Sequence, residues 1–402
     1  MTPSKSGLYH LRLPQELVDA IIHELDDDSP PLLACSKAAK TFRVPCQRRI
    51  FRSILLYSED SGFSNTFLRA AELLATSPHL AVYVRDLRTP LPTAENEIQS
   101  LERVLGALDN VERFMIANTG ESINWSPTPP RLVSAIWRII TLPSLDHLHF
   151  ANIFNLPYSL VYRAASATRV LSLDGVRIRG PAGKTPPAPP VLQLEHLILM
   201  SRSLRAVSES LIDLMQHGYL QRLHRLSLTL ASGTIQDYLQ MYTPLSGVVR
   251  HLEIDYSTCT TPITFPRFAL LQVLDLSFYL GMARHLPATF VHILSNLPTT
   301  APLVERLSFT FGIMPQIPEI PWTRATPFCL FDDGFMQRRA LPRLRSVTFC
   351  LYLMMDYFFG CQNVSYDGFI GAVEEMLPGL RDIDMLAFSK RNPGYQYQDH
   401  LP

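Results

Sequence analysis

A short apolar pattern recurs along most of this chain and constrains its fold more than any other feature. Each copy has an apolar residue at position one and further apolar residues at positions four and six. The copies begin roughly 22 to 40 residues apart, which predicts a repeat array. They read VRDLRT from Val84, VERFMI from Val111, LDHLHF from Leu145, TRVLSL from Thr168, LEHLIL from Leu194, LHRLSL from Leu223, VRHLEI from Val249, LQVLDL from Leu271, VERLSF from Val304, LRSVTF from Leu344 and LRDIDM from Leu380.

Each copy predicts a short strand whose positions four and six face a buried core. Helical patterns lie between the copies, and turn signals such as Pro143-Ser144 precede several of them. These patterns span residues 98–108, 132–140, 204–217, 285–297 and 366–377. Strands alternating with helices at this period are typical of leucine-rich repeats, so we predict an α/β fold with a curved leucine-rich-repeat-like β/α solenoid. A doubly wound sheet is the alternative, and the short strands and the missing glycine-rich phosphate loop favour the solenoid.

The stretch from Leu11 to Leu56 predicts three short amphipathic helices before the array. Leu17, Ile21 and Leu25 recur at helical spacing on one face of the first helix. Pro45 is expected to begin the third helix, because proline suits a first helical turn. Three such helices carry too little apolar surface for a confident independent core, so we expect the unit to pack on a partner or on a neighbouring domain. A helical cap on the array is the alternative.

The residues of this stretch resemble an F-box, most of all the F-box variants that are numerous in mushroom-forming fungi. The Leu-Pro-x-Glu-Leu opening, the Leu-Leu-x-Cys-Ser core and the Gln-Arg-x-Ile-Phe-Arg-x-Ile exit carry the resemblance. Ala38, Ala39 and Phe42 depart from it, since a valine, a cysteine and a tryptophan are common there. The resemblance implies a three-helix domain that docks on the Skp adaptor of a cullin–RING (SCF) ubiquitin ligase. It places the adaptor contact on Leu13, Pro14, Glu16, Leu17, Ile21, Leu25, Leu32 and Leu33.

The predicted organisation has four parts. Residues 1–10 form a tail, residues 11–52 the F-box, residues 53–388 the solenoid, and residues 389–402 a polar tail. No Gly/Ser-rich or charged spacer separates the F-box from the array, so we expect little free linker between them. Two proline-rich segments, Gly180–Pro190 and Ile313–Pro327, are expected to be exposed loops.

Composition excludes several classes of partner. The chain has 402 residues, with 36 basic and 36 acidic side chains, so its bulk charge indicates neither nucleic acid nor an anionic membrane as a partner. The N-terminus has no apolar signal-peptide core, and no stretch is long and apolar enough to span a membrane. The six cysteines lack any metal-binding or disulfide spacing. We therefore expect a protein of the cytoplasm, the nucleus or both.

The sequence predicts no enzyme, no cofactor and no metal site. Gly183-Lys184-Thr185 matches the end of a phosphate-binding loop, but the two following prolines deny the helix that such a loop requires. No known nucleophile or metalloprotease motif occurs. His147 and His149 flank Leu148 on one predicted strand and are a conceivable half of a metal site, but a solvated or hydrogen-bonded pair is the simpler interpretation.

Basic residues recur at position three of the copies, which faces outward on the concave sheet. Stacked on adjacent strands, they predict a basic stripe beside acidic residues at positions five and seven. This surface is expected either to bind an acidic or phosphorylated segment, more strongly below about pH 6.5, or to be ordinary surface with local ion pairs. Position three reads Arg113, His147, Val170, His196, Arg225, His251, Val273, Arg306, Ser346 and Asp382, and the acidic residues are Glu253, Asp275, Asp384, Asp174 and Asp255. Substrate contacts are expected at Arg113, His147, His196, Arg225, His251 and Arg306.

Together these features predict the substrate-recognition subunit of an SCF-type ubiquitin ligase. The F-box would bind the Skp-type adaptor and, through it, the cullin, and the repeat array would recruit an unidentified protein substrate. A repeat scaffold acting outside a ligase is the first alternative, and an enzyme is the second.

Overall fold

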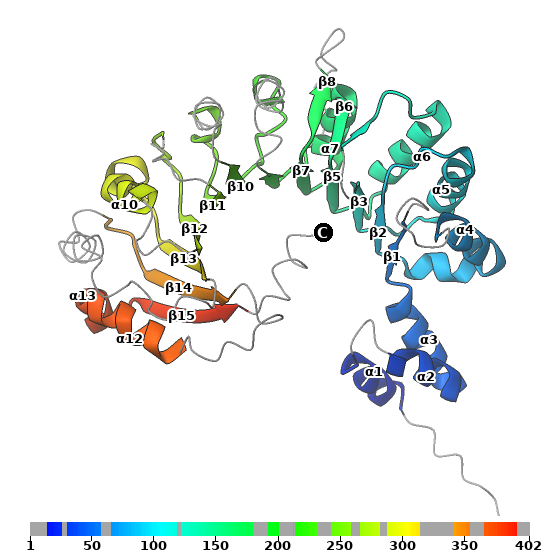
Figure 1. The fold of residues 1–402 in the computed structure, drawn as a ribbon, viewed down its shortest axis with the longest axis horizontal. Coiled ribbons are helices and arrows are strands. Elements are labelled where there is room, and N and C mark those ends of the chain that lie inside the picture. Colours follow the sequence, from blue (N-terminus) through cyan, green and yellow to red (C-terminus); the bar gives the residue numbers. More distant parts are fainter. Residues whose placement is uncertain are drawn as a thin grey trace, which may run out of the picture. The chain divides into compact units, whose positions relative to one another are not determined.

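The computed structural model shows a mixed α/β protein whose strands pair mostly in parallel (Figure 1). Its contacts divide the chain into two compact units, which are described separately. Unit 1 comprises Met1–Phe114 and Pro129–Leu145, and unit 2 comprises Met115–Thr128 and Asp146–Pro402. The structure describes residues 14–25, 30–57, 66–118, 122–179, 192–200, 212, 214–231, 243–258, 266–281, 288–313, 341–353 and 366–391.

Unit 1 begins with three short helices, called here the three-helix segment. They are α1 (Gln15–His23), α2 (Pro30–Ala38) and α3 (Lys40–Ile50). Their shared core, called here the inner cluster, consists of Val18, Ile22, Leu32 and Cys46. Arg49 of α3 donates a hydrogen bond to the carbonyl oxygen of Ile22, which lies in the last turn of α1. A cationic side chain suits that position, because the carbonyls at a helix C-terminus lack partners within the helix.

The third helix begins at Lys40, so the predicted start at Pro45 is wrong. Pro45 lies in the interior of α3, where its missing N–H removes one backbone hydrogen bond. The helix continues through it because Phe42, Cys46 and Ile50 recur every four residues, and all three pack in or against the inner cluster. Tertiary packing of that apolar stripe outweighs the local penalty of the proline.

The rest of unit 1 confirms the expected alternation of strands and helices. Strand β1 follows α3 after only Phe51 and Arg52, and it pairs in parallel with β2. Helix α5 packs against both α4 and α6. The elements are β1 (Ser53–Leu55), α4 (Thr66–Thr76), the 3-10 helix η2 (Pro78–Tyr83), β2 (Asp86–Thr89), α5 (Glu95–Ala107), the start of β3 (Arg113–Ala117) and α6 (Pro130–Ile140).

Unit 2 contains a parallel sheet whose strands follow chain order. From β5 through β15, each strand of this sheet pairs with the sheet's next strand in chain order, without the reversal of strand order that a doubly wound sheet requires. The strands are β5 (His147–Ala151), β7 (Val170–Asp174), β9 (His196–Leu199), β10 (Arg225–Ala231), β11 (His251–Thr258), β12 (Val273–Gly281), β13 (Arg306–Ile313), β14 (Ser346–Leu353) and β15 (Leu386–Arg391).

Helices and a second small sheet complete unit 2. Helices α10, α12 and α13 lie along one side of strands β12 to β15 (Figure 1). A smaller parallel sheet has the order β4-β6-β8. These elements are β4 (Ile123–Asn124), β6 (Ile153–Pro157), α7 (Tyr158–Ala167), β8 (Arg177–Arg179), α10 (Ala288–Thr300), α12 (Tyr366–Met376) and α13 (Pro378–Asp382).

Positions four and six of the repeated pattern form the core of unit 2, as predicted. Leu148 and Phe150 on β5 are fully buried, and the equivalent residues on every strand through β14 are also buried. The rings of Phe309 and Phe349 lie 5.3 Å apart between centroids, and Phe369 of α12 packs edge-on against Phe388 of β15. Each fully buried side chain of this size contributes about 1.5–3 kcal/mol of transfer free energy.

The last copy of the pattern does not form the predicted strand. Residues 378–382 form helix α13, with Pro378 in its first turn, and strand β15 begins only at Leu386. Asp384 has a φ of 55° between the two elements. Val347 at position four of β14 pairs with Leu386, so the pattern that the structure uses starts three residues later, at Ile383. Asp382 and Asp384 therefore do not occupy positions three and five.

The predicted tail boundary is also too early, because β15 continues through Ser389 to Arg391. The proline-rich segment 180–190 lies outside the described residues, and so do residues 314–327 of the other proline-rich segment. The same holds for the N-terminal tail and for the Gly183-Lys184-Thr185 sequence.

Candidate partner-binding surfaces

Large apolar side chains are exposed on the three-helix segment. Leu17 and Ile21, one turn apart on α1, are 52% and 46% exposed, and Leu33 on α2 is 53% exposed. We call these three side chains the outer apolar residues. The inner cluster is complete without them, so the segment does not use them for its own folding. Several large apolar side chains exposed on so small a unit indicate contact with another surface.

The structure divides the predicted adaptor residues into two groups. Pro14 and Glu16 are exposed at the start of α1, the helix that also carries Leu17 and Ile21. Leu32 is 0% exposed in the inner cluster and Leu25 packs against that cluster, so the prediction that Leu32 contacts a partner is wrong. Leu13 lies outside the described residues.

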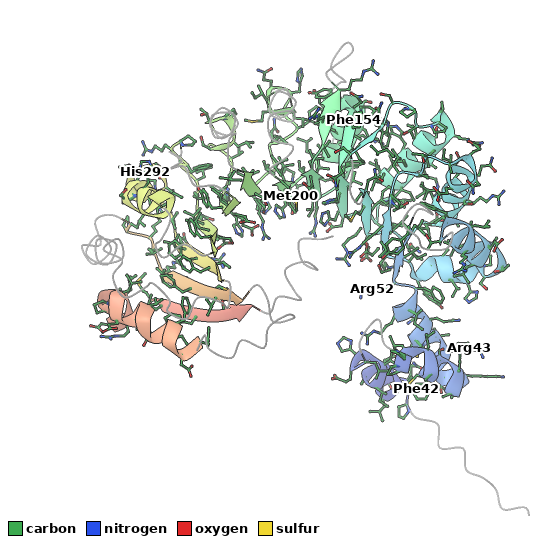
Figure 2. All side chains as sticks on the ribbon, in the orientation of Figure 1. Phe42, Arg43, Arg52, Phe154, Met200 and His292 are labelled. Carbon is green, nitrogen blue, oxygen red and sulfur yellow. The ribbon has the colours of Figure 1, made fainter. Side chains whose placement is uncertain are left out.

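Helix α3 shows the same division between consecutive residues. Phe42 packs against the inner cluster, whereas Arg43 is exposed; both are labelled in Figure 2. Phe42 stands where the F-box resemblance leads us to expect a tryptophan, and its ring packs against the cluster. The departure from the expected residue therefore leaves the core of the segment packed.

The position-three residues of unit 2 stand in register across the sheet. His147 pairs with Val170, and the pairing continues strand by strand through His196, Arg225 and His251. It extends through Val273 and Arg306 to Ser346. The predicted row is thus present from β5 to β14, with neighbouring strands about 4.8 Å apart.

In the middle of this row the basic side chains are paired with carboxylates, so the row is not a continuous stripe of unpaired positive charge. Arg225 donates a hydrogen bond to Glu253 Oε1, and Ser227 donates one to Glu253 Oε2. His251 Nε2 lies 2.7 Å from Asp275 Oδ2 and 3.4 Å from Glu253 Oε1. The interpretation as surface with local ion pairs therefore holds for Arg225 and His251. Burial alone would raise the pKa of Glu253, but the bonds from Ser227 and Arg225 lower it overall.

His196 is neutral at physiological pH. Its Nε2 lies 2.7 Å from Ser227 Oγ, and because the hydroxyl proton of Ser227 points to Glu253, the imidazole is the donor. Burial, followed by the nearby charge of Arg225, lowers the pKa of His196 to about 3. The expectation that the histidines gain charge near pH 6.5 is therefore wrong for His196.

Two arginines of the predicted stripe differ from this middle part. Arg113, in unit 1, forms an ion pair of 3.1 Å with Asp86, which is 2% exposed and also binds Arg88. Arg306 is exposed on β13, and among the residues that the structure describes no carboxylate lies within ion-pair distance of it. Asp86 was missed as a site residue although it occupies position three of the first copy, which is the signal that would have found it.

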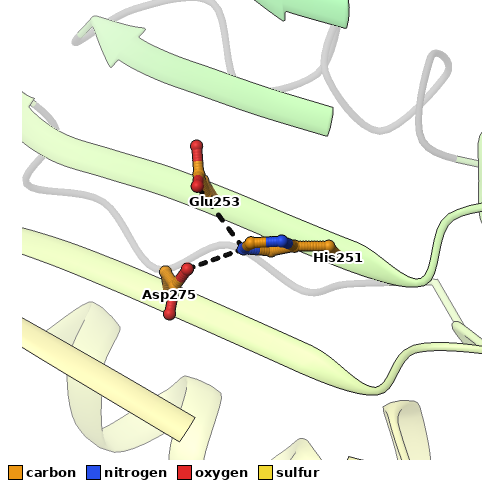
Figure 3. A group of neighbouring side chains, drawn as sticks. All are labelled: His251, Glu253 and Asp275. Carbon is orange, nitrogen blue, oxygen red and sulfur yellow. Dashed lines mark hydrogen bonds and ion pairs between the residues drawn. The ribbon is translucent and has the colours of Figure 1, made fainter. Parts of the chain in front are cut away.

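His147 and His149 do not form an open metal half-site. His147 is partly buried on β5, and His149, at position five, is only 1% exposed. A different group converges at the middle of the sheet, where His251, Glu253 and Asp275 face one another from β11 and β12 (Figure 3). Their positions in the pattern, three and five on neighbouring strands, predict that the three residues lie near one another but not that they share one site.

No model of a known protein family matches the chain, and no curated protein is significantly similar to it. Within the described residues, no helix has both the length and the apolar character needed to cross a membrane.

Proposed function

We propose that the protein is the substrate-recognition subunit of an SCF-type ubiquitin ligase. Residues 11–52 would act as an F-box that binds a Skp-type adaptor, and the later repeats would form a leucine-rich-repeat-like solenoid that recruits a protein substrate. The observation that carries the proposal is the exposure of Leu17, Ile21 and Leu33 on a segment whose own core is already filled.

The contact surface follows from that exposure. Leu17, Ile21 and Leu33 would bury their side chains against the adaptor, together with Pro14 and Glu16 at the start of α1. Burying each large apolar side chain contributes about 1.5–3 kcal/mol of transfer free energy, part of which offsets the entropy lost on association. Leu25 and Leu32 would support this surface from within.

The parallel sheet supports the second half of the proposal. Strands that pair in the order of the chain, with positions four and six buried from β5 to β14, are what a leucine-rich-repeat-like array requires. Such a subunit would catalyse nothing itself. It would hold the substrate near the ligase, so that transfer of ubiquitin proceeds at a high effective concentration. Cytoplasm or nucleus is the expected location of that activity.

Co-purification of the full chain with a Skp-type adaptor and a cullin tests the proposal. Changing Leu17 and Ile21 together to aspartate is expected to weaken adaptor binding at least about tenfold, because two desolvated contacts become charged. Val82→Asp is the matched control, since Val82 is 54% exposed on η2, outside the three-helix segment. Circular dichroism melting checks that both variants remain folded.

The outcomes separate the alternatives. Binding of adaptor and cullin by the wild type and the Val82→Asp variant, lost in the double variant, supports the ligase role. Binding of the adaptor without the cullin supports a scaffold acting outside the ligase. Undiminished adaptor binding by the folded double variant contradicts the proposed surface.

A further inference from the structure

We propose that His251, Glu253 and Asp275 bind one divalent transition metal ion of the Zn²⁺ type on the outward face of the sheet. The three side chains offer one nitrogen and two carboxylate oxygens, and their ligand atoms lie within 4.8 Å of one another. An imidazole combined with carboxylates is a donor set that Zn²⁺ and neighbouring first-row ions accept. The site is independent of the proposed ligase function.

The parallel register brings the three side chains together. His251 and Glu253 are two residues apart on β11, so they project from the same face. Glu253 pairs with Asp275 on β12, which places the two carboxylates on neighbouring strands. A rigid sheet therefore holds all three donors, and none depends on a flexible loop (Figure 3).

The distances are compatible with a shared ion. Donors bound to one zinc ion at about 2.1 Å lie about 3.4 Å from one another in a tetrahedral arrangement. His251 Nε2 and Glu253 Oε1 are already 3.4 Å apart. His251 Nε2 and Asp275 Oδ2, at 2.7 Å, form a hydrogen bond that would open by less than about 1 Å, with the imidazole proton on Nδ1. The side chains are 19–34% exposed, so solvent can reach the site and supply a fourth ligand.

The surrounding residues orient the carboxylate and oppose the ion. Ser227 donates a hydrogen bond to Glu253 Oε2, which fixes the direction of the carboxylate. Arg225 donates to Oε1, the oxygen that faces His251, and so competes with an ion for it. Arg225 also places a positive charge beside the site, which disfavours a cation. Removing that charge is therefore expected to tighten metal binding, whereas removing a ligand is expected to weaken it.

Isothermal titration of the full chain, without a polyhistidine tag, with ZnCl₂ alone tests the site. His251→Gln and Asp275→Asn are each expected to weaken one binding event at least about tenfold, or to remove it. His224→Gln is the matched control, because His224 is an exposed histidine on the approach to β10 and is not part of the group. Arg225→Gln is expected to bind Zn²⁺ several-fold more tightly.

Titrations that are the same in the wild type and both ligand variants overturn the site. So does the absence of a saturable binding event in the wild type. Melting curves without metal show whether the variants are folded. If either ligand variant does not fold, Arg225→Gln decides, and an affinity that is unchanged or weaker than that of the wild type overturns the proposal.

Discussion

The three-helix segment and the strands of unit 2 solve the burial of apolar residues in opposite ways. The strands of the larger unit 2 sheet from β5 to β14 bury their position-four and position-six side chains in a shared core. The three-helix segment buries one small cluster and leaves Leu17, Ile21 and Leu33 exposed. On the outward face of the unit 2 sheet, by contrast, Arg225, Glu253, His251 and Asp275 pair with one another across β10, β11 and β12. One region therefore exposes apolar side chains to a partner, and the other exposes a polar row whose middle part is paired.

Side chains of the same type therefore serve different purposes: some leucines stabilise the fold, and others are available for recognition of a partner. Leu226 and Leu228 on β10 are core residues because they project from the inner face of the sheet, whereas Arg225 and Ser227 project from the outward face. A leucine on α2 is a core residue or a contact residue depending on which side of a nine-residue helix it occupies. Substitutions that separate these roles test the comparison, beginning with the largest expected effect.

Truncating a core aromatic residue of unit 2 is expected to give the largest loss of stability. Phe309→Ala should lower the free energy of unfolding by about 3–5 kcal/mol, because Phe309 is fully buried and packs on Phe311 and Phe349. Urea unfolding followed by circular dichroism measures the change. Leu17→Ala, at a half-exposed site, is the control and is expected to shift stability by less than about 0.5 kcal/mol. A loss below about 1 kcal/mol for Phe309→Ala would contradict the burial of this ring.

Two adjacent leucines give the sharpest test inside the three-helix segment. Leu32→Ala should lower the free energy of unfolding by about 2–4 kcal/mol, since Leu32 is 0% exposed in the inner cluster. Leu33→Ala should change it by less than about 0.5 kcal/mol, since Leu33 is 53% exposed. Adaptor binding at a temperature where both variants are folded should show the reverse order. Equal stability of the two variants would mean that the division between inner and outer residues is misplaced.

The pH dependence of stability tests the burial of His196. The folded protein keeps this imidazole neutral, with a pKa of about 3, while the unfolded chain takes up a proton below its ordinary pKa of 6.5. Stability is therefore lost as the pH falls from about 6.5 toward 3, by about 1.4 kcal/mol per pH unit, or about 2 kcal/mol at pH 5. The charged and titratable groups around it are Arg225, Glu253, His147 and His251.

Comparison with a variant isolates this contribution from the other histidines. His196→Asn keeps a group that can donate to Ser227 but does not titrate. Its loss of unfolding free energy between pH 7 and pH 5 should be smaller than that of the wild type by about 2 kcal/mol. The same loss in both proteins would show that His196 is solvated in the folded state.

The repeated pattern predicted most of the strands because alternation of buried residues is local information. It failed at the last copy because LRDIDM and IDMLAF, three residues apart, both fit the pattern. Helix α13, which begins at Pro378, includes the first three residues of LRDIDM, so that copy cannot form a strand. Periodicity alone does not reveal this helix. Pro45 was misjudged for the converse reason, since the packing of Phe42, Cys46 and Ile50 against α1 and α2 overrides a local signal.

The polar row shows a second limit of sequence reasoning. Counting positions placed His251, Glu253 and Asp275 close together, because strand register follows from the pattern. The positions in the pattern did not show that Arg225 and His251 form ion pairs with carboxylates on the neighbouring strands, or that burial keeps His196 neutral. Those properties depend on side-chain conformation and on the depth of each site, which one chain's residue order does not specify.

The smallest expected effect on stability comes from substituting Arg306, which belongs to the same row as Arg225 but lies in different surroundings. Arg306→Glu should change the free energy of unfolding by less than about 0.5 kcal/mol, because the side chain is exposed and no described carboxylate is within ion-pair distance. Arg225→Glu should cost more, since it sets a second carboxylate beside Glu253. Arg306 is therefore the position at which binding of an acidic segment can be tested without disturbing the fold. Loss of co-purified partners from a folded Arg306→Glu variant would favour an acidic or phosphorylated substrate, whereas retention of those partners would place the substrate contact elsewhere in the chain.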